Sequence, residues 1–459
     1  MVMPITKSIG VTDTERFLAD LCEKTFLRLW SYPSPYRDDG HEFCDLLAVF
    51  NNHVFLFFDR EGKHFSKNEK EPQLNWERWK RKVVDRQIKS ARGAERYLRS
   101  GRIISLDARG DVPFPIDITR DRMIVHKIVV AHGAAEACKE FSPDNVTGSL
   151  AIFYGKGPDH MPFPFSIALD RDDPVHVLDT HNLPILFSEM DTFADLALYF
   201  EAKIEAIRKY ELIVYCGEED VIANYFRNYD KASNRHFIGV KNKDANVLWI
   251  AEGEWSILVD RPEYKAKKKA DETSYFWDEI IQRTCQNALD GTLLGNANLL
   301  QGRSALHEMA REPRFMRRGL SDNMLRVVGE FPEWPGEVVR HVAFMPSFYE
   351  RKAYVFLQLK VEGECDDNAA YRAKRQALLD IACGAAKNKF PELTTIVGIG
   401  VDAPKFNPHT AEDFLLLDCH KWTPEIRAHY EEANREFKFF ASPSLQIRKR
   451  KLQNFPETN

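Results

Sequence analysis

The first thirty residues carry apolar side chains at the spacing of an amphipathic helix. Thr12, followed three residues later by Glu15, is the pattern of a capping box, and apolar residues then recur at helical intervals as far as Trp30. Pro33 and Pro35 come next, and proline disfavours helix both before itself and inside it. We therefore expect one helix that begins at Thr12 and ends before these prolines.

Two almost continuous apolar runs follow, at residues 43–50 and 54–58, with the turn-forming Asn51-Asn52-His53 between them. Such runs suit strands of a sheet that is covered on both faces, so they predict a buried hairpin. A polar stretch precedes a second long helix, which we expect from about Trp76 to Leu98. The predicted order is helix, hairpin, helix.

The remainder of the chain mixes strand and helix patterns. Residues 103–190 predict mostly strands, Thr192 with Asp195 predicts the cap of a helix that reaches about Tyr210, and residues 261–330 predict helices. Beyond Pro332 a new alternation predicts strands near 340–345, 353–361, 394–400 and 414–418, with a helix near 368–388.

This pattern predicts the α/β (α+β) fold class and three domains, because 459 residues exceed the size of one ordinary core. We expect the boundaries near residues 105 and 332. Residues 1–104 then form the first domain and residues 105–331 a mixed α/β middle region of no assigned role. Residues 332–459 form an α+β domain that we expect to sense a trigger or bind a partner.

Composition narrows the class of protein. With 44% hydrophobic residues, the chain is that of a globular protein. No apolar run approaches the roughly 20 residues of a membrane span, and residues 1–10 lack the apolar region of a secretory signal. We therefore expect a cytoplasmic protein with no membrane partner. The eight cysteines show no CxxC spacing, which predicts reduced thiols rather than a zinc site.

Candidate chemistry lies on the predicted hairpin. Asp45 begins the first strand, and Asp59, Glu61 and Lys63 follow the second at intervals of two residues, which places them on one face if the strand continues that far. Carboxylates on a hairpin are suited to Mg²⁺, and a neighbouring lysine can orient a water nucleophile. In the other register the strand closes on Phe58-Asp59-Arg60, which offers no acid at its first place and arginine at its last.

Asp45 followed by Glu61-Gly62-Lys63 resembles the D…ExK motif of the PD-(D/E)XK nuclease superfamily. The resemblance covers roughly residues 12–100 and implies a restriction-endonuclease-like core that uses Mg²⁺ or Mn²⁺. It implies metal ligands at Asp45, Asp59 and Glu61, with Glu23 of the first helix as a further candidate, and catalytic roles for Asp45, Glu61 and Lys63. Glu15 is the alternative acid of that helix, although its capping-box role explains it without a metal.

Three short stretches also resemble a group of large bacterial proteins: Leu29-Trp30-Ser31-Tyr32-Pro33, Cys44-Asp45-Leu46-Leu47 and Trp76-Glu77-Arg78-Trp79. By analogy alone, this second resemblance implies a role in antiviral defence.

The second predicted helix is strongly basic. Between Trp76 and Arg102 there are ten lysines and arginines against three acids, and such residues supply sequence-independent affinity for phosphate backbones. The candidate nucleic-acid contacts are Arg78, Trp79, Lys80, Lys82, Arg86 and Lys89. In the nuclease superfamily this helix lies beside the cleft, which also makes Gln87 a candidate. For Trp76 and Trp79 we favour packing against the sheet over base stacking, because a helix needs an apolar face to dock.

Other clusters carry weaker signals. Basic groups at Arg311 to Arg318, Lys265 to Lys269 and Arg448 to Lys451 would extend a path for a polyanion, although charge runs are usually solvated surface. Histidines on predicted strands, such as His126 and His176, are expected to be core or edge residues rather than a metal or acid–base site.

These patterns favour a metal-dependent nuclease that cleaves DNA or RNA. The alternative is a nuclease-like nucleic-acid-binding or scaffold protein that has lost catalysis. A third class is a sensor with no nucleic-acid role. We also expect a homo-oligomer or a protein activator as partners. The register of residues 58–63 distinguishes the nuclease from the protein that has lost catalysis. Phe58-Asp59-Arg60 at the site predicts poor metal binding, whereas Asp59, Glu61 and Lys63 at the site predict that a metal binds.

Overall fold

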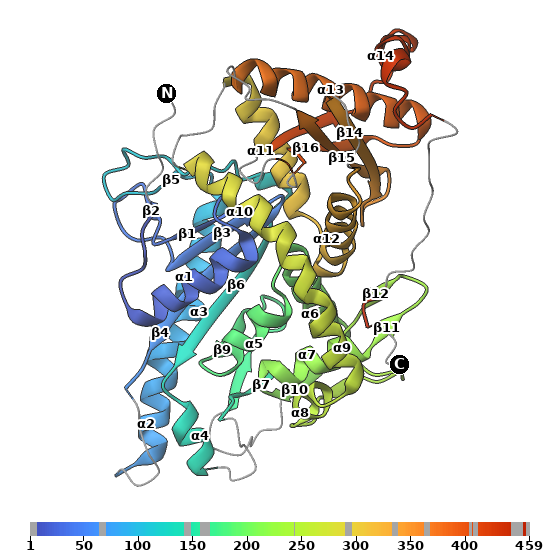
Figure 1. Ribbon diagram of the computed structural model, residues 1–459. Helices are drawn as coiled ribbons and strands as arrows, with labels where there is room; N and C mark the ends of the chain where they lie inside the picture. Colours follow the sequence, from blue (N-terminus) through green and yellow to red (C-terminus); the bar gives the residue numbers. More distant parts are fainter. Residues whose placement is uncertain are drawn as a thin grey trace. The chain divides into compact units, whose positions relative to one another are not determined.

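The computed structural model describes residues 7–63, 70–141, 148–156, 166–242, 244–289, 296–332, 338–361, 368–403, 406, 412–441 and 453–455. The chain forms two compact units (Figure 1). The N-terminal unit is Ile5–Lys265, and the C-terminal unit is Met1–Pro4 with Ala266–Asn459. Both mix helices with sheets, which confirms the α/β class. The predicted boundary near residue 105 falls inside the N-terminal unit, because strands on both sides of it share one sheet.

The N-terminal unit is built from two main sheets and the helices around them. Its strands in the five-stranded sheet are β1 (Ser31–Pro33), β3 (Leu46–Phe50), β4 (His53–Glu61), β6 (Ile124–His132) and β9 (His176–Asp179). Its four-stranded sheet contains β7 (Ala151–Gly155), β8 (Ser166–Leu169), β10 (Leu212–Cys216) and β13 (Val247–Trp249). Short ladders pair β2 (Tyr36–Arg37) with β5 (Ile104–Ser105) and β11 (Tyr229–Asp230) with β12 (Arg235–His236).

The helices of this unit are α1 (Asp13–Phe26), α2 (Pro72–Trp79), α3 (Arg86–Arg99), α4 (Ala135–Phe141), α5 (Asn182–Glu189), α6 (Phe193–Lys209), α7 (Glu218–Arg227) and α8 (Glu254–Val259). A π-helical segment, Lys80–Asp85, joins α2 to α3, and Arg120–Arg122 forms a 3-10 turn. The capping box predicted at Thr12 is confirmed, and Thr192 caps α6 as predicted: their side chains accept from the amides of Glu15 and Asp195.

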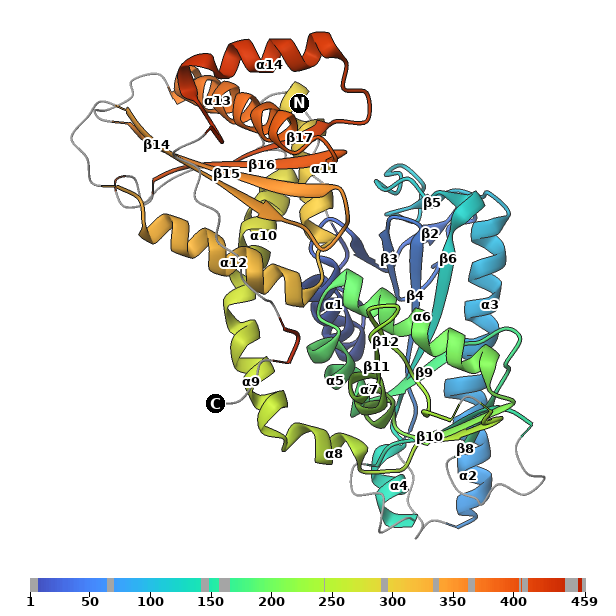
Figure 2. The ribbon, with the colours of Figure 1, turned by 90° about the vertical axis from the view of Figure 1, so that its right-hand side faces the viewer.

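The five-stranded sheet runs in the order β1-β3-β4-β6-β9. The predicted hairpin is confirmed: β3 and β4 pair antiparallel around Asn51, whose φ of 54° makes the turn. β6 then pairs parallel to β4, and β9 parallel to β6. α1 and α3 lie on opposite sides of the sheet (Figure 2). Every residue of β3 is buried, as its continuous apolar run predicts.

The C-terminal unit contains a four-stranded sheet in the order β14-β15-β16-β17. These strands are Val338–Pro346, Lys352–Val361, Thr395–Asp402 and Asp413–Asp418, close to the predicted positions. α13 (Asn368–Lys389) connects the parallel β15 and β16 and packs on the sheet. The other helices are α9 (Pro262–Asp271), which spans the unit boundary, and α10 (Tyr275–Leu289), α11 (Asn296–Ala310), α12 (Arg314–Gly329) and α14 (Pro424–Phe437), with a 3-10 turn at Glu272–Ser274.

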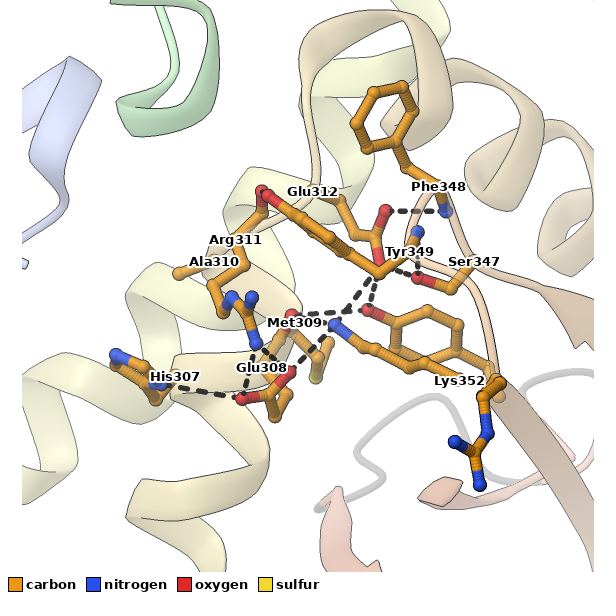
Figure 3. Close-up of polar contacts among 12 residues, drawn as sticks. His307, Glu308, Met309, Ala310, Arg311, Glu312, Ser347, Phe348, Tyr349 and Lys352 are labelled. Atoms are coloured by element: carbon orange, nitrogen blue, oxygen red, sulfur yellow. Dashed lines mark hydrogen bonds and ion pairs between the residues drawn. The ribbon is translucent and has the colours of Figure 1, made fainter. Parts of the chain in front are cut away.

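A buried ion network ties the end of α11 to β15 in this unit (Figure 3). Lys352 Nζ lies 3.0 Å from Glu308 Oε2 and 3.1 Å from Glu312 Oε1. Tyr354 donates its hydroxyl to Glu312 at 2.8 Å. Burial alone would raise the pKa of Glu308, but His307, Lys352 and Arg311 hold it well below its usual range. The network therefore stabilises the charged forms of its members in the interior.

Candidate functional site

A cavity of about 730 Å³ lies in the N-terminal unit, on the α3 side of the hairpin. We call it the α3 pocket. It is bounded by the segment from Glu42 to Asp45, by Phe58 to Arg60 near the end of β4, and by side chains of α3 and the turn that follows it. Arg37 and Arg102 complete the wall. Its size is that of a small-ligand site rather than a surface dimple.

One face of α3 forms the long wall of the pocket. Arg86, Ser90, Gly93 and Tyr97 recur at intervals of three and four residues, which places them along a single face. A Cβ added at Gly93 would meet only the Arg96 guanidinium, at 3.9 Å, so small side chains leave this wall open. Gln87, named by the nuclease resemblance, also lines the pocket.

Asp45 is the acid on this side of the hairpin. It precedes β3, is half-buried, and accepts a hydrogen bond at Oδ2 from the backbone amide of Asp59, at 2.5 Å. Burial raises the pKa of Asp45 to about 7, and the nearby carboxylates of Glu42, Glu15 and Asp59 add to the rise. The hydrogen bond from the Asp59 amide acts in the opposite direction and lowers this pKa. Burial also raises the pKa of Glu42. A carboxyl near pKa 7 can change its protonation state at physiological pH.

The carboxylate of Asp59 is bound within the fold. Its Oδ1 accepts from the Thr14 hydroxyl of α1 at 2.6 Å, and its Oδ2 lies 2.9 Å from His132 Nε2. His132 Nδ1 in turn lies 2.8 Å from the Thr180 hydroxyl. Both carboxylate oxygens of Asp59 therefore have protein partners, on the α1 side of the sheet.

Glu61 and Lys63 are exposed and do not line the pocket. Gly62 between them donates its amide to the carbonyl of His132. A Cβ at Gly62 would lie 2.4 Å from the Trp79 ring, so the glycine permits α2 to pack against the end of β4. The residues that border the pocket beside Asp45 are thus Phe58, Asp59 and Arg60. This is the register that lacks an acid at its first position.

The two candidate acids of α1 differ in position. Glu15 influences the pKa of Asp45, and its carboxylate also accepts from the amides of Val11 and Thr12. Glu23 lies eight residues further, roughly 12 Å along the helix, and accepts from Arg28 Nε at 2.6 Å. The structure therefore brings Glu15, and not Glu23, close to Asp45.

The donor set expected for Mg²⁺ or Mn²⁺ is not assembled. Among the residues that the structure describes, no three His, Cys, Asp or Glu side chains are placed to hold a metal ion. Asp59 is occupied by Thr14 and His132, and Glu61 lies away from the pocket. The residues present do not fit the metal that the nuclease resemblance implies.

The basic residues of the helical segment divide into three groups. Arg86 lines the pocket, whereas Arg78, Lys82 and Lys89 are exposed outside it. Lys80 pairs with Asp85. Arg60 and Arg96 also line the pocket, although the sequence singled out neither as a candidate contact. Arg60 belongs to the alternative register Phe58-Asp59-Arg60, and Arg96 is one of the ten basic residues between Trp76 and Arg102.

Trp79, which the sequence suggests as a nucleic-acid contact, is buried and cannot serve as one. It is 4% exposed, stacks on Trp76 at 5.3 Å and donates its indole N–H to the carbonyl of His132. A base cannot stack on a ring that is enclosed in this way. Trp76 and Trp79 are therefore packed inside the fold, which is the position favoured from the sequence.

The arginines of the α3 pocket differ in their partners. Arg37 pairs with Asp39, and Arg102 pairs with Asp38 and lies over the Tyr97 ring. Arg60, Arg86 and Arg96 make no ion pair with any residue in the described part of the chain. The pocket therefore presents three guanidinium groups whose charge is not balanced by a direct partner there.

Most arginines of the Arg311 to Arg318 group, and one lysine of the Lys265 to Lys269 group, are buried and ion-paired. Arg317 is fully buried, and Arg314 and Arg318 nearly so; Asp278 and Asp271 pair with them, so they offer no path to a polyanion. Lys267 is buried against Asp271, and Arg448 to Lys451 lie outside the described residues. His126 and His176 are buried core residues, as expected.

Comparisons of the chain with protein-family models, with curated proteins and with solved structures found no match. In the described ranges, no helix combines the length and apolar character needed to cross a bilayer. The α3 pocket contains Asp45 and three arginines that make no ion pair among the described residues, and it is the candidate functional site.

Proposed function

We propose that the α3 pocket binds the phosphate backbone of a nucleic acid, in a nuclease-like domain that has lost metal-dependent cleavage. The observation that carries this proposal is the set of three arginines, Arg60, Arg86 and Arg96, that face one pocket without ion-pair partners among the described residues. Guanidinium groups form two parallel hydrogen bonds to a phosphate, which makes arginine the preferred residue for that anion.

The register of β4 supports the loss of catalysis. Arg60 stands where an active site would have lysine, and Phe58 where it would have an acid. A phenyl ring cannot bind Mg²⁺, and the neighbouring Asp59 is bound by Thr14 and His132. Arg60 would keep the positive charge of the motif while Phe58 removes its metal ligand.

Metal-dependent cleavage is the second candidate, and one observation favours it. The pKa of Asp45 is raised by burial and by Glu42, Glu15 and Asp59, and a cluster of carboxylates that repel one another is the kind of place where a divalent cation would be stabilising. The DNA or RNA substrate would be the same in both.

Binding is tested by fluorescence anisotropy of the full chain with labelled DNA and RNA over a series of salt concentrations. Arg60→Ala, Arg86→Ala and Arg96→Ala should each weaken binding about tenfold and lower the salt slope by about one unit. Arg261→Ala, which removes an exposed arginine of the same unit outside the pocket, is the matched control and should change neither. Equal effects of all four variants would contradict a pocket-specific site.

Cleavage is tested on the same nucleic acids with Mg²⁺ and with Mn²⁺. The proposal expects no cleavage by the wild type, and no change in binding when Glu61→Gln or Lys63→Ala is introduced. Metal-dependent cleavage that Asp45→Asn abolishes would instead establish the nuclease. The folded state of each variant is checked by its thermal unfolding.

A further inference from the structure

The α3 pocket contains acids as well as arginines, and a phosphate-binding site does not explain them. Asp45 and Glu42 border the same cavity as Arg60, Arg86 and Arg96. A carboxylate repels a phosphate, so its presence weakens a site that binds only the backbone. The acids therefore call for a different group of the same ligand.

The spacing of the arginines separates their contacts. Arg86 and Arg96 are ten residues apart on α3, which is roughly 15 Å along a helix axis. The two side chains therefore begin at opposite ends of this wall. Since one strand of stacked nucleic acid advances 3.4 Å per nucleotide, that distance corresponds to roughly four nucleotides. The two arginines therefore suit two different phosphates of one strand.

The small side chains of α3 leave room between these ends. Ser90, Gly93 and Ala94 border the pocket between Arg86 and Arg96, and a Cβ at Gly93 would meet only the far end of Arg96. Asp45 borders the same cavity, with Oδ2 bound to the Asp59 amide. Its other oxygen, Oδ1, has no hydrogen bond within the described part of the chain.

We infer that the α3 pocket holds a single strand of nucleic acid, with Arg86 and Arg96 on separate phosphates and Asp45 on the amino group of a base between them. This inference rests on the function proposed above. Carboxylates accept hydrogen bonds from the amino group of cytosine, and that amino group is paired in a duplex and available in a single strand. A narrow basic groove along the backbone is the usual design for single-strand binding.

The ionised form of Asp45 is the acceptor that a base amino group needs. Because burial and the neighbouring carboxylates raise the pKa of Asp45 to about 7, the ionised form dominates above neutral pH and the protonated form below it. A protonated carboxyl adds a donor that meets no partner on an amino group.

The Asp45→Asn variant tests the base contact directly. An amide NH2 group cannot accept the Asp59 amide proton, so the side-chain oxygen takes that bond and the NH2 group faces the pocket. This replaces an acceptor by a donor. Thymine presents a carbonyl where cytosine presents an amino group, so the preference of the variant should shift from cytosine toward thymine.

The experiment measures anisotropy of the full chain with oligodeoxycytidylate, oligodeoxythymidylate and a duplex, all of equal length, at a pH well above neutral. We expect the wild type to bind the cytidylate roughly fivefold tighter than the thymidylate and at least about tenfold tighter than the duplex. Asp45→Asn should reverse the first ratio, whereas Asp260→Asn, at an exposed site of the same unit, should leave it unchanged. Ribo- and deoxyribo-oligonucleotides distinguish RNA from DNA.

The outcomes separate this inference from the proposed function. Equal affinity for the duplex and the single strands, with loss of binding in Arg86→Ala, would overturn the inference and leave backbone binding intact. An unchanged ratio of cytidylate to thymidylate in Asp45→Asn would overturn the base contact. No salt-dependent binding of any nucleic acid would overturn both proposals.

Discussion

The backbone amide of Asp59 donates a hydrogen bond to Asp45 Oδ2 at 2.5 Å, which joins the start of β3 to the end of β4. This bond fixes one oxygen of Asp45 and leaves the other at the α3 pocket. The side chain of Asp59 meanwhile binds Thr14 and His132. Two aspartates that the sequence suggests as joint metal ligands thus have separate tasks.

Asp45→Asn should stabilise the N-terminal unit at alkaline pH. The pKa of Asp45 is raised to about 7 in the folded chain and is near 3.9 when unfolded, so the folded state loses stability as the pH rises from about 4 to about 7. Asparagine carries no charge and removes that loss. Because Asp45 is partly exposed, we expect a gain of about 1–2 kcal/mol above pH 7 and almost none near pH 4. Urea unfolding at both pH values measures it, and an equal gain at both would contradict the cause.

Gly62→Ala should destabilise the protein although Gly62 is not in a helix or strand. The new Cβ would lie 2.4 Å from the Trp79 ring and 2.7 Å from a methyl group of Val83, so these buried side chains would have to move. We expect a loss of roughly 1–3 kcal/mol in the free energy of unfolding. Combining it with Trp79→Leu should cost less than the sum of the two changes. Strict additivity would show that the ring is not the obstacle.

The N-terminal unit should lose stability in mild acid through a pair of buried histidines. His53 Nδ1 lies 3.0 Å from His126 Nε2. Burial lowers the pKa of His53 to about 4 and holds the pKa of His126 well below its usual range. Glu201 lies 3.5 Å from His53 on its outer side.

Because both imidazoles are neutral in the fold and take up protons when unfolded, stability falls as the pH drops from about 6.5 to about 4. We expect roughly 3 kcal/mol from His53 alone. Thermal unfolding across that range should show a shallower slope in the double variant His53→Phe, His126→Phe, and an unchanged slope in the exposed control His41→Gln. A steep slope that survives in the double variant would assign the acid sensitivity to other groups.

Lys352→Met should strongly destabilise the C-terminal unit (Figure 3). It leaves the buried carboxylate of Glu312 without the ammonium group 3.1 Å away, and uncompensated buried charges cost about 3–5 kcal/mol. The double variant Lys352→Met, Glu312→Gln should recover part of this loss, because the charge of Glu312 is removed. Urea unfolding measures both, with exposed Lys389→Met as the control. A double variant as unstable as the sum of its parts would mean that the two residues do not interact.

Local signals in the sequence determined much of the fold. The capping box at Thr12 needs only two residues of one helical turn, and the hairpin of β3 and β4 needs two apolar runs and a tight turn at Asn51. Interactions over such short separations are encoded by neighbouring residues. For the same reason the α/β class and the helix α13 followed from the pattern alone.

Only the tertiary structure decided what the candidate acids do. Alternation along β4 separates Asp59 from Arg60, but the sequence does not say which helix covers each face. Asp59 became a structural residue because His132, 73 positions later, is brought beside it by the parallel pairing of β6 with β4. The same pairing places the His132 carbonyl where the Trp79 indole donates to it, and it makes the N-terminal unit extend beyond the predicted boundary near residue 105. These contacts depend on segments distant in the chain, and a local pattern contains no information on which of them will meet.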